Sequence, residues 1–423
     1  MENATKKYLI KLENVVMPSP ISNKLPLNSN AIRQSSALPN EATISYTSAV
    51  SVPILQQKPG NGMARVNGQM ALMTALNESG FISAFPTHNS SSIAERSRLG
   101  INPQRAQYLL SQQGTLAAEA QQEMEYIVSS QLNNFTGIKQ QVQNLSRQYY
   151  HTVPEYYKNN ICEALDDYQG KHGDNILMNI SAMGFTDVKS YLKSRSSLFV
   201  NENEVDEFMS AFAYHYGAFT GIDDEEEELE ELKSRIEGRL MEPTRQLDLY
   251  LHNAPRLQGG IPLMKGATGG DNPITTQVNG GEMLAAILRG DALHFNGFLS
   301  TSSKYDTALD FCGKVPSTAL GKPYCVIDLT KNDEKNEILR RHVFGELQKG
   351  SVDTGSLLFL FKANNVAGIS VNATKYAENP FGDEHSLSFE DEILMAPGHF
   401  FMPERIIINE RGIAFFGSLN YGR

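Results

Sequence analysis

Two carboxylates close together in the C-terminal half could carry out acid–base or electrostatic catalysis. The segment Glu390-Asp391-Glu392 places them two residues apart. In a β-strand residues i and i+2 face the same side, so we expect Glu390 and Glu392 to point into the same space. Neighbouring carboxylates repel each other, which separates their pKa values and suits them to different roles. An ordinary ion-paired strand would have the same spacing, so this motif alone does not establish a catalytic site.

Two further motifs precede the acidic one and contain polar groups that suit a site. Ser300, Thr301 and Ser302 follow an aromatic and an aliphatic residue, a composition that predicts a strand. The hydroxyls of Ser300 and Ser302 share one face, and a hydroxyl can donate to a carboxylate and so orient it. Earlier in the chain, Lys265-Gly266 ends another predicted strand.

The order of these motifs resembles the arginine-serine-glutamate class of mono-ADP-ribosyltransferases, which includes exoenzyme S-like bacterial toxins and type III effectors. In that family an aromatic and Arg-Gly strand comes first, then S-T-S, then E-x-E. The resemblance is carried by LMKGATGGD, by FNGFLSTSSKYDTALDF and by FEDEILMAPG, which lie within roughly residues 245–410. It implies NAD⁺ as a substrate, no metal, and transfer of ADP-ribose to a protein.

The resemblance also implies a role for each catalytic residue. Glu392 matches the catalytic glutamate, which would hydrogen-bond a hydroxyl of the nicotinamide ribose and stabilise the oxocarbenium ion as nicotinamide leaves. Glu390 matches the glutamate that engages an arginine acceptor, because a carboxylate pairs well with a guanidinium. Ser300 matches the serine that orients the catalytic glutamate.

The expected NAD⁺ contacts include one departure from the family pattern. Lys265 stands where the family has the Arg that holds an NAD phosphate, and lysine keeps the charge but loses the bidentate fork. Gly266 would let the backbone approach the nicotinamide amide closely. Thr301 and Ser302 would support the NAD pocket. If Lys265 does not hold the phosphate, the nearby candidates are Arg256 and Arg289.

The elements that must position these residues indicate an α+β fold. Short β-prone runs separated by turns dominate after residue 260 and predict an ADP-ribosyltransferase fold, with a β-sandwich core and flanking helices. Residues 201–423 are assigned to this domain and residues 61–200 to a mainly α-helical domain. Within the latter, apolar residues at helical spacing form a stripe that needs a partner surface: Leu116, Ala120, Met124, Ile127 and Val128.

The first 60 residues are rich in proline, serine and asparagine, which predicts a disordered leader. This leader could carry a type III secretion signal and bind a secretion chaperone, although an ordinary cytosolic N-terminus would look the same. Next, GNGMARVNGQMALMTAL resembles the arginine-finger loop of bacterial GTPase-activating effectors, with Arg65 as the finger. A targeting, chaperone-binding or substrate-docking domain is the alternative.

Composition narrows the classes of partner and compartment. A net charge of −11 argues against general nucleic-acid binding, and no apolar run is long enough to span a membrane. Three cysteines without a pairing pattern predict a reducing compartment. Together with the resemblance, these features predict a secreted effector that modifies a host protein in the host cytoplasm. An NAD glycohydrolase and a catalytically degenerate binding module remain as alternatives.

Overall fold

The computed structural model describes residues 82–96, 98, 100–133, 135–169, 174–187, 190–191, 227, 230–231, 234–268, 280–312, 320–378 and 391–421. All of them belong to one compact unit, Ala71–Arg423. The predicted leader, Arg65 and the predicted domain boundaries at residues 60 and 200 lie outside the described residues and stay predictions.

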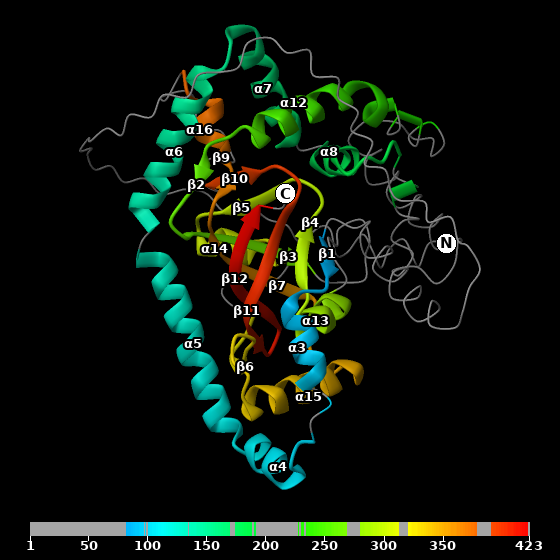
Figure 1. Cartoon of the computed structure of the whole chain (residues 1–423). Coiled ribbons are helices and arrows are strands. Elements are labelled where there is room, and N and C mark those ends of the chain that lie inside the picture. The colour runs from blue at the N-terminus through cyan, green and yellow to red at the C-terminus, as the bar shows by residue number, and fades with distance from the viewer. Residues whose placement is uncertain are drawn as a thin grey trace. The chain divides into compact units, whose positions relative to one another are not determined.

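Within the described residues, the centre of the fold is a ten-stranded sheet (Figure 1). Its path runs β1-β4-β11-β12-β7-β3-β5-β10-β9, and β6 pairs with β11 off this path. Most neighbours are antiparallel, but β12 runs parallel to β7. The strands are β1 (Ile82–Phe85), β3 (Ile261–Thr268), β4 (Ala292–Phe295), β5 (Leu299–Ser302), β6 (Pro323–Asp328), β7 (Ser356–Ala363), β9 (Ile369–Ser370), β10 (Glu392–Met395), β11 (His399–Asn409) and β12 (Gly412–Tyr421). A separate pair consists of β2 (Arg256–Leu257) and β8 (Val366–Ala367).

The sheet folds over on itself and encloses an aromatic core. Phe295 of β4 and Phe361 of β7 lie three strands apart in the sheet, which would separate them by about 14 Å if it were flat. Their ring centroids are instead 5.8 Å apart. Phe359, Phe401 and Phe415 are fully buried in the same cluster. The predicted α+β class is confirmed, and face-to-face packing of non-adjacent strands is the arrangement of a sandwich core.

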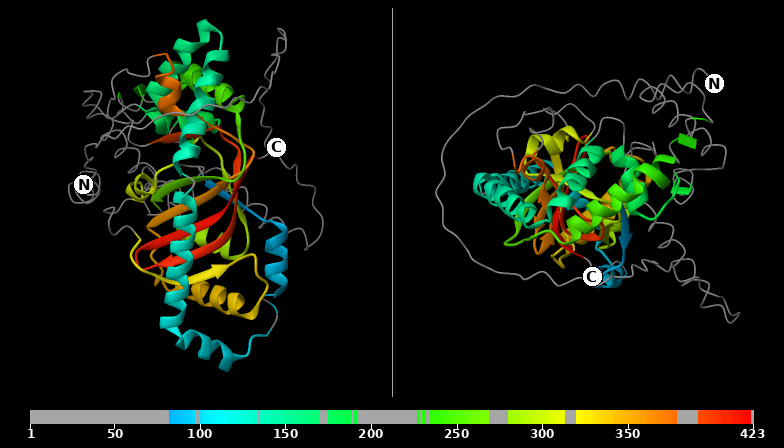
Figure 2. Two further views of the ribbon diagram at one scale, coloured as in Figure 1. Left: turned by 90° about the vertical axis from the view of Figure 1, so that its left-hand side faces the viewer. Right: turned by 90° about the horizontal axis from the view of Figure 1, so that it is seen from above.

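The helices of the first half are α3 (His88–Arg96), α4 (Pro103–Ser111), α5 (Gln113–Asn133), α6 (Phe135–Thr152), α7 (Glu155–Tyr168) and α8 (Asp174–Ala182). The apolar stripe of α5 packs on the sheet, mainly along β6 and also against β11. Ala120 and Ile127 are buried in one cluster with residues of β7, β11 and β12. Figure 2 shows α5 running alongside the sheet. The partner surface of the predicted stripe is therefore the sheet built by the C-terminal half.

One strand lies within the region that the sequence pattern predicted to be mainly α-helical. The segment ISAF forms β1, which pairs antiparallel with β4 at the edge of the sheet, with Ile82 opposite Phe295. The segment is short and apolar and is followed by Pro86, and strand pairing buries its backbone polar groups. The helical pattern of the region did not indicate this strand, because local periodicity does not show which sheet edge is available for pairing.

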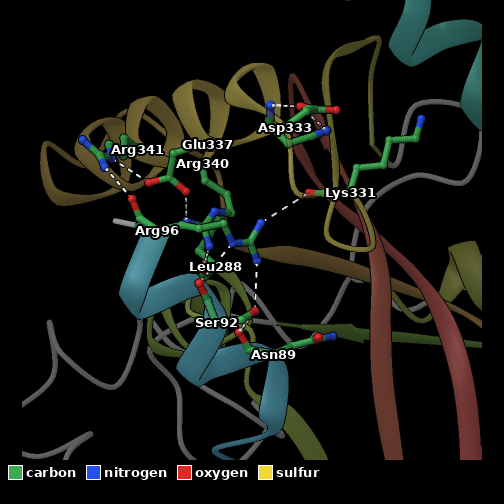
Figure 3. Close-up of polar contacts among 10 residues, drawn as sticks. Asn89, Ser92, Arg96, Leu288, Lys331, Asp333, Glu337, Arg340 and Arg341 are labelled. Atoms are coloured by element: carbon green, nitrogen blue, oxygen red, sulfur yellow. Dashed lines mark hydrogen bonds and ion pairs between the residues drawn. The ribbon is translucent and has the colours of Figure 1, made fainter. Parts of the chain in front are cut away.

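The remaining helices cover the sheet and its edges: η2 (Arg235–Arg239), α12 (Met241–His252), α13 (Gly280–Leu288), α14 (Tyr305–Asp310), α15 (Glu334–Gln348) and α16 (Val371–Lys375). η2 is a π-helical turn. Polar contacts join α3 to α15 (Figure 3): Arg341 donates to the carbonyl of Arg96 at 3.3 Å and to Glu337 at 2.7 Å. No helix in the described part of the chain is long and apolar enough to cross a membrane.

Candidate active site

The second and third motifs lie side by side on neighbouring strands. β5 and β10 are antiparallel, with Ser302 opposite Glu392 and Ser300 opposite Leu394. Ser300 and Glu392 are thus diagonal neighbours on one face, a separation that side chains can bridge. Ser300 Oγ donates a hydrogen bond of 2.7 Å to Glu392 Oε1. The serine that the sequence places 92 residues from the glutamate is therefore in position to orient it.

The second oxygen of Glu392 is held from outside the sheet. Gln169, the residue after α7, donates from Nε2 to Glu392 Oε2 at 2.9 Å. Glu392 is 6% exposed, and this burial raises its pKa. The hydrogen bonds from Ser300 and Gln169 and the charges of Lys265 and Lys375 act in the opposite direction. The carboxyl therefore combines a dry environment with several groups that favour its ionised form.

Lys265 of β3 lies beside this pair. Its Nζ donates to the backbone carbonyl of Ser300 at 3.3 Å, and the residue is 9% exposed. Burial lowers its pKa to about 8, against the opposing effect of the Glu392 charge. An ammonium has three donors, and one of them is directed at the Ser300 carbonyl. A basic group thus lies next to the serine and glutamate that the sequence grouped with it.

Thr301 and Ser302 have contacts of a different kind. Thr301 Oγ1 donates to the carbonyl of Ile393 at 2.8 Å, a buried bond that ties β5 to β10. Ser302 Oγ accepts from the backbone N–H of Lys304 at 2.9 Å, which shapes the turn before α14. These contacts stabilise the frame around Ser300, and the predicted support of an NAD pocket by both residues stays a prediction.

Gly266 is required by packing inside the protein. A Cβ at this position would lie 1.9 Å from the carbonyl oxygen of Ala308 in α14 and 2.9 Å from the backbone nitrogen of Cys312. Only glycine allows the helix after the S-T-S strand to lie this close to β3. The predicted approach of NAD⁺ to this backbone stays a prediction, beside this packing reason for the residue.

The E-x-E motif is not a continuous strand. β10 begins at Glu392, and Asp391 has a φ of 47°, in the left-handed region. Lys139 of α6 contacts both Asp391 carboxylate oxygens at 2.6 Å, and Lys304 lies 3.3 Å away. The expectation that Glu390 and Glu392 share one side assumed strand backbone through Asp391, which does not have it, and the relative placement of the two glutamates stays a prediction. Glu390 itself lies outside the described residues.

The described contacts of Arg256 and Arg289, the alternative candidates for the phosphate contact, are with residues other than Ser300 and Glu392. The Arg256 guanidinium lies over the ring of Tyr421, 4.3 Å from its centroid. Arg289 follows α13 and pairs with Asp291 at 3.2 Å. Of the three basic residues considered for this role, Lys265 is the one whose contacts join it to the Ser300–Glu392 pair.

Three residues at the site were not predicted. Gln169 touches Glu392, Lys375 of α16 donates to Gln169 Oε1 at 3.0 Å, and Lys139 holds Asp391. Gln169 and Lys139 are separated from their partners by 223 and 252 residues, whereas Lys375 ends the short helix α16 that precedes β10, and none of the three belongs to a recognisable pattern. Their positions follow only from the tertiary packing, in which α16 lies against β10 and α6 and α7 lie against α16. Within the described residues, no group of three or more His, Cys, Asp or Glu could hold a metal.

No known family model matches the chain, and no curated protein matches it either. Among solved structures, it is similar to the Vis toxin, an ADP-ribosyltransferase from Vibrio splendidus, with 12% identity and a TM-score of 0.29 over 70% of this chain and 85% of that one. It is also similar to the C3 exoenzyme of Clostridium limosum, with 14% identity and a TM-score of 0.24 over 43% of this chain and 69% of that one. Scores this low carry no argument, so the functional inference depends on the site itself.

Proposed function

We propose that the chain is an NAD⁺-dependent protein mono-ADP-ribosyltransferase with Glu392 as its catalytic carboxylate. One observation carries the proposal: Ser300 Oγ donates to Glu392 Oε1 at 2.7 Å across the adjacent strands β5 and β10. The serine and glutamate that the motif order pairs are thus in contact. Lys265, the basic residue of the first motif, is hydrogen-bonded to Ser300.

The reaction uses the charge and position of Glu392. The bond between nicotinamide nitrogen and ribose C1′ breaks with its electron pair going to nicotinamide, which leaves as a neutral molecule. An oxocarbenium ion develops on the ribose, and a buried carboxylate beside it stabilises that charge. The nucleophile of the acceptor then attacks C1′ and loses a proton. Ser300 fixes the orientation of the carboxylate in advance, so little reorganisation is needed during the reaction.

Lys265 is proposed to hold a phosphate of NAD⁺, in place of the family's arginine. Its position beside Ser300 supports the proposal, and so does the limited solvent around it, because a charge–charge contact is stronger in a dry environment. Since its pKa is about 8, the amine is mainly protonated at neutral pH. Ser302 and Thr301 are proposed to shape the pocket through the turn and strand that they stabilise.

The acceptor and the biological setting follow from the same proposal. Glu390 is proposed to engage the guanidinium of an arginine acceptor on a host protein. The chain is proposed to be a secreted effector acting in the host cytoplasm, with a chaperone bound to its N-terminal region before secretion. A GTPase-activating role for the region around Arg65 is a separate proposal, supported by the motif GNGMARVNGQMALMTAL.

Labelling of a host-cell lysate tests the function. The purified chain is incubated with NAD⁺ labelled in its adenylate part, beside a Glu392→Gln variant. Label on a protein band that the variant does not produce supports transfer, and mass spectrometry of that band identifies the modified residue. Free ADP-ribose alone supports a glycohydrolase. If neither product forms although the protein is folded, the site is that of a binding module and the proposal is wrong.

A Glu390→Gln variant separates the two glutamates in the same assay. If Glu390 serves the acceptor, protein labelling falls by much more than NAD⁺ hydrolysis. Equal loss of both activities would show that Glu390 and Glu392 do not divide the work in this way.

A further inference from the structure

The contact between Gln169 and Glu392 reaches the site from a helix that the motifs do not include. Gln169 caps the C-terminal end of α7, where its backbone N–H donates to the carbonyl of Leu165 at 2.9 Å. Its side chain lies between two charged groups. Nε2 donates to Glu392 Oε2 at 2.9 Å, and Oε1 accepts from Lys375 Nζ at 3.0 Å.

The chemistry of these neighbours fixes the orientation of the amide. An ammonium has donors and no acceptor, so Lys375 can meet only the amide oxygen of Gln169. An ionised carboxylate has acceptors and no donor, so Glu392 can meet only the amide nitrogen. The reversed amide would lose both hydrogen bonds. The ammonium also polarises the amide, which strengthens the hydrogen bond that the amide donates to Glu392.

The end of α7 is anchored to the same strands that carry the site. Tyr168 packs edge-on against Phe298, the residue before β5, with ring centroids 5.7 Å apart. Asp166 on α7 forms an ion pair with Lys375, whose helix follows β9. β9 in turn pairs with β10. Both neighbours of the glutamate strand therefore help to hold Glu392, β5 directly through Ser300 and β9 through Lys375 and Gln169.

We propose that Gln169 is a positioning residue that holds the second oxygen of Glu392 and, with Lys375 behind it, favours the ionised form of this carboxylate. The inference rests on the proposed function for its role in catalysis. It requires no departure of Gln169 when substrate binds, because a carboxylate has about four lone-pair sites and the two described bonds leave room for a ribose hydroxyl. Lys265 and Lys375 are the charged groups that interact with Glu392 from β3 and α16.

The first test compares the kinetics of Gln169→Met with those of wild type in NAD⁺ hydrolysis. Methionine has nearly the same shape and makes neither hydrogen bond. The expected results are a fall in kcat of about tenfold, a smaller change in KM, and a rise of about one unit in the pH of the acid limb. Gln246→Met is the matched control, because Gln246 donates to Glu242 at the same 2.9 Å on the exposed face of α12. An unchanged acid limb in Gln169→Met would overturn the inference.

The second test does not depend on activity, so it separates this inference from the proposed function. Loss of the Gln169 bond should raise the pKa of Glu392 further, and a raised carboxyl pKa makes the folded state less stable as the pH rises. Gln169→Met should therefore lower the Tm more at pH 8 than at pH 5. The same substitution in a Glu392→Gln background should lower it equally at both pH values. If the cost is equal at both pH values in the wild-type background too, Gln169 does not act through Glu392, whether or not the chain consumes NAD⁺.

Discussion

Replacing Ser300 with alanine removes one hydrogen bond to the proposed catalytic carboxylate and little else. The bond is 2.7 Å long and its acceptor is buried, so solvent does not weaken it. Hydrogen bonds to charged groups contribute about 1.5–3 kcal/mol, which corresponds to about 10- to 100-fold in rate. Part of the stabilisation from this bond is already present in the ground state, where it does not accelerate the reaction. Gln169 also still holds the other oxygen of Glu392, so we expect a fall in kcat near the lower end of that range.

The pH profile gives an independent measure of the same change. The Ser300 hydrogen bond lowers the pKa of Glu392, so its loss should raise that pKa and move the acid limb of kcat/KM to higher pH. Initial rates of NAD⁺ consumption between pH 4 and pH 9 would show the shift. Ser418→Ala is a matched control, because Ser418 on β12 donates to Glu404 on the neighbouring strand at 2.6 Å. The reasoning fails if Ser300→Ala keeps more than half of the wild-type kcat, or if Ser418→Ala loses as much.

The other predictions concern the remaining motif residues. Glu392→Gln should lower NAD⁺ consumption by about 100-fold or more in the same rate assay. Burial raises the pKa of Glu392, so the contribution of this carboxyl to stability is present at low pH and is lost as the pH rises. The Tm of the variant should therefore fall less between pH 4 and pH 8 than the Tm of wild type. Lys265 should lose its charge above its pKa of about 8, so the KM for NAD⁺ should rise between pH 8 and pH 9 in wild type. In Lys265→Arg the KM should stay level over the same range, because arginine keeps its charge. Equal pH profiles of the two proteins would show that Lys265 does not bind NAD⁺. Gly266→Ala places a Cβ 1.9 Å from the Ala308 carbonyl, so its free energy of unfolding in urea should fall by about 2–3 kcal/mol, and a loss below about 0.5 kcal/mol would contradict the packing described.

The pairing of the S-T-S and glutamate strands is the part of the site that sequence reasoning predicted best. Ser300 and Glu392 were paired because the order of the motifs resembles that of a known family, and a hydroxyl is also suited to orient a carboxylate. The position of Lys265 beside them was also expected from motif order. These inferences concern the residues that would do the chemistry, whose identities are restricted by it. The Ser300–Glu392 hydrogen bond shows that the second and third motifs are in contact in the structure.

The contacts that complete the site could not be predicted in the same way. Gln169 at the end of α7 and Lys139 on α6 are polar residues of ordinary types, and nothing in the local sequence distinguishes them from other polar residues. Their positions depend on which helix packs over which strand, which is a property of the tertiary structure. The turn at Asp391 was missed because three acidic residues before an apolar run look like the start of a strand, while the ion pairs that stabilise a φ of 47° come from distant elements. β1 was missed for a similar reason, because its pairing partner lies about 200 residues later.

The ion pair between Lys139 and Asp391 joins residues that are 252 positions apart, and Gln169 is separated from Glu392 by 223. Ribosomes add about 5–20 residues per second, so on the order of 10–50 seconds pass between the synthesis of Lys139 and that of its carboxylate partner. During that interval α6 and α7 can form, but neither can meet the strand that it later supports. Asp391 and Glu392 therefore meet Lys139 and Gln169 only after the whole intervening chain has been made. Until then, a nascent chain cannot assemble the proposed site.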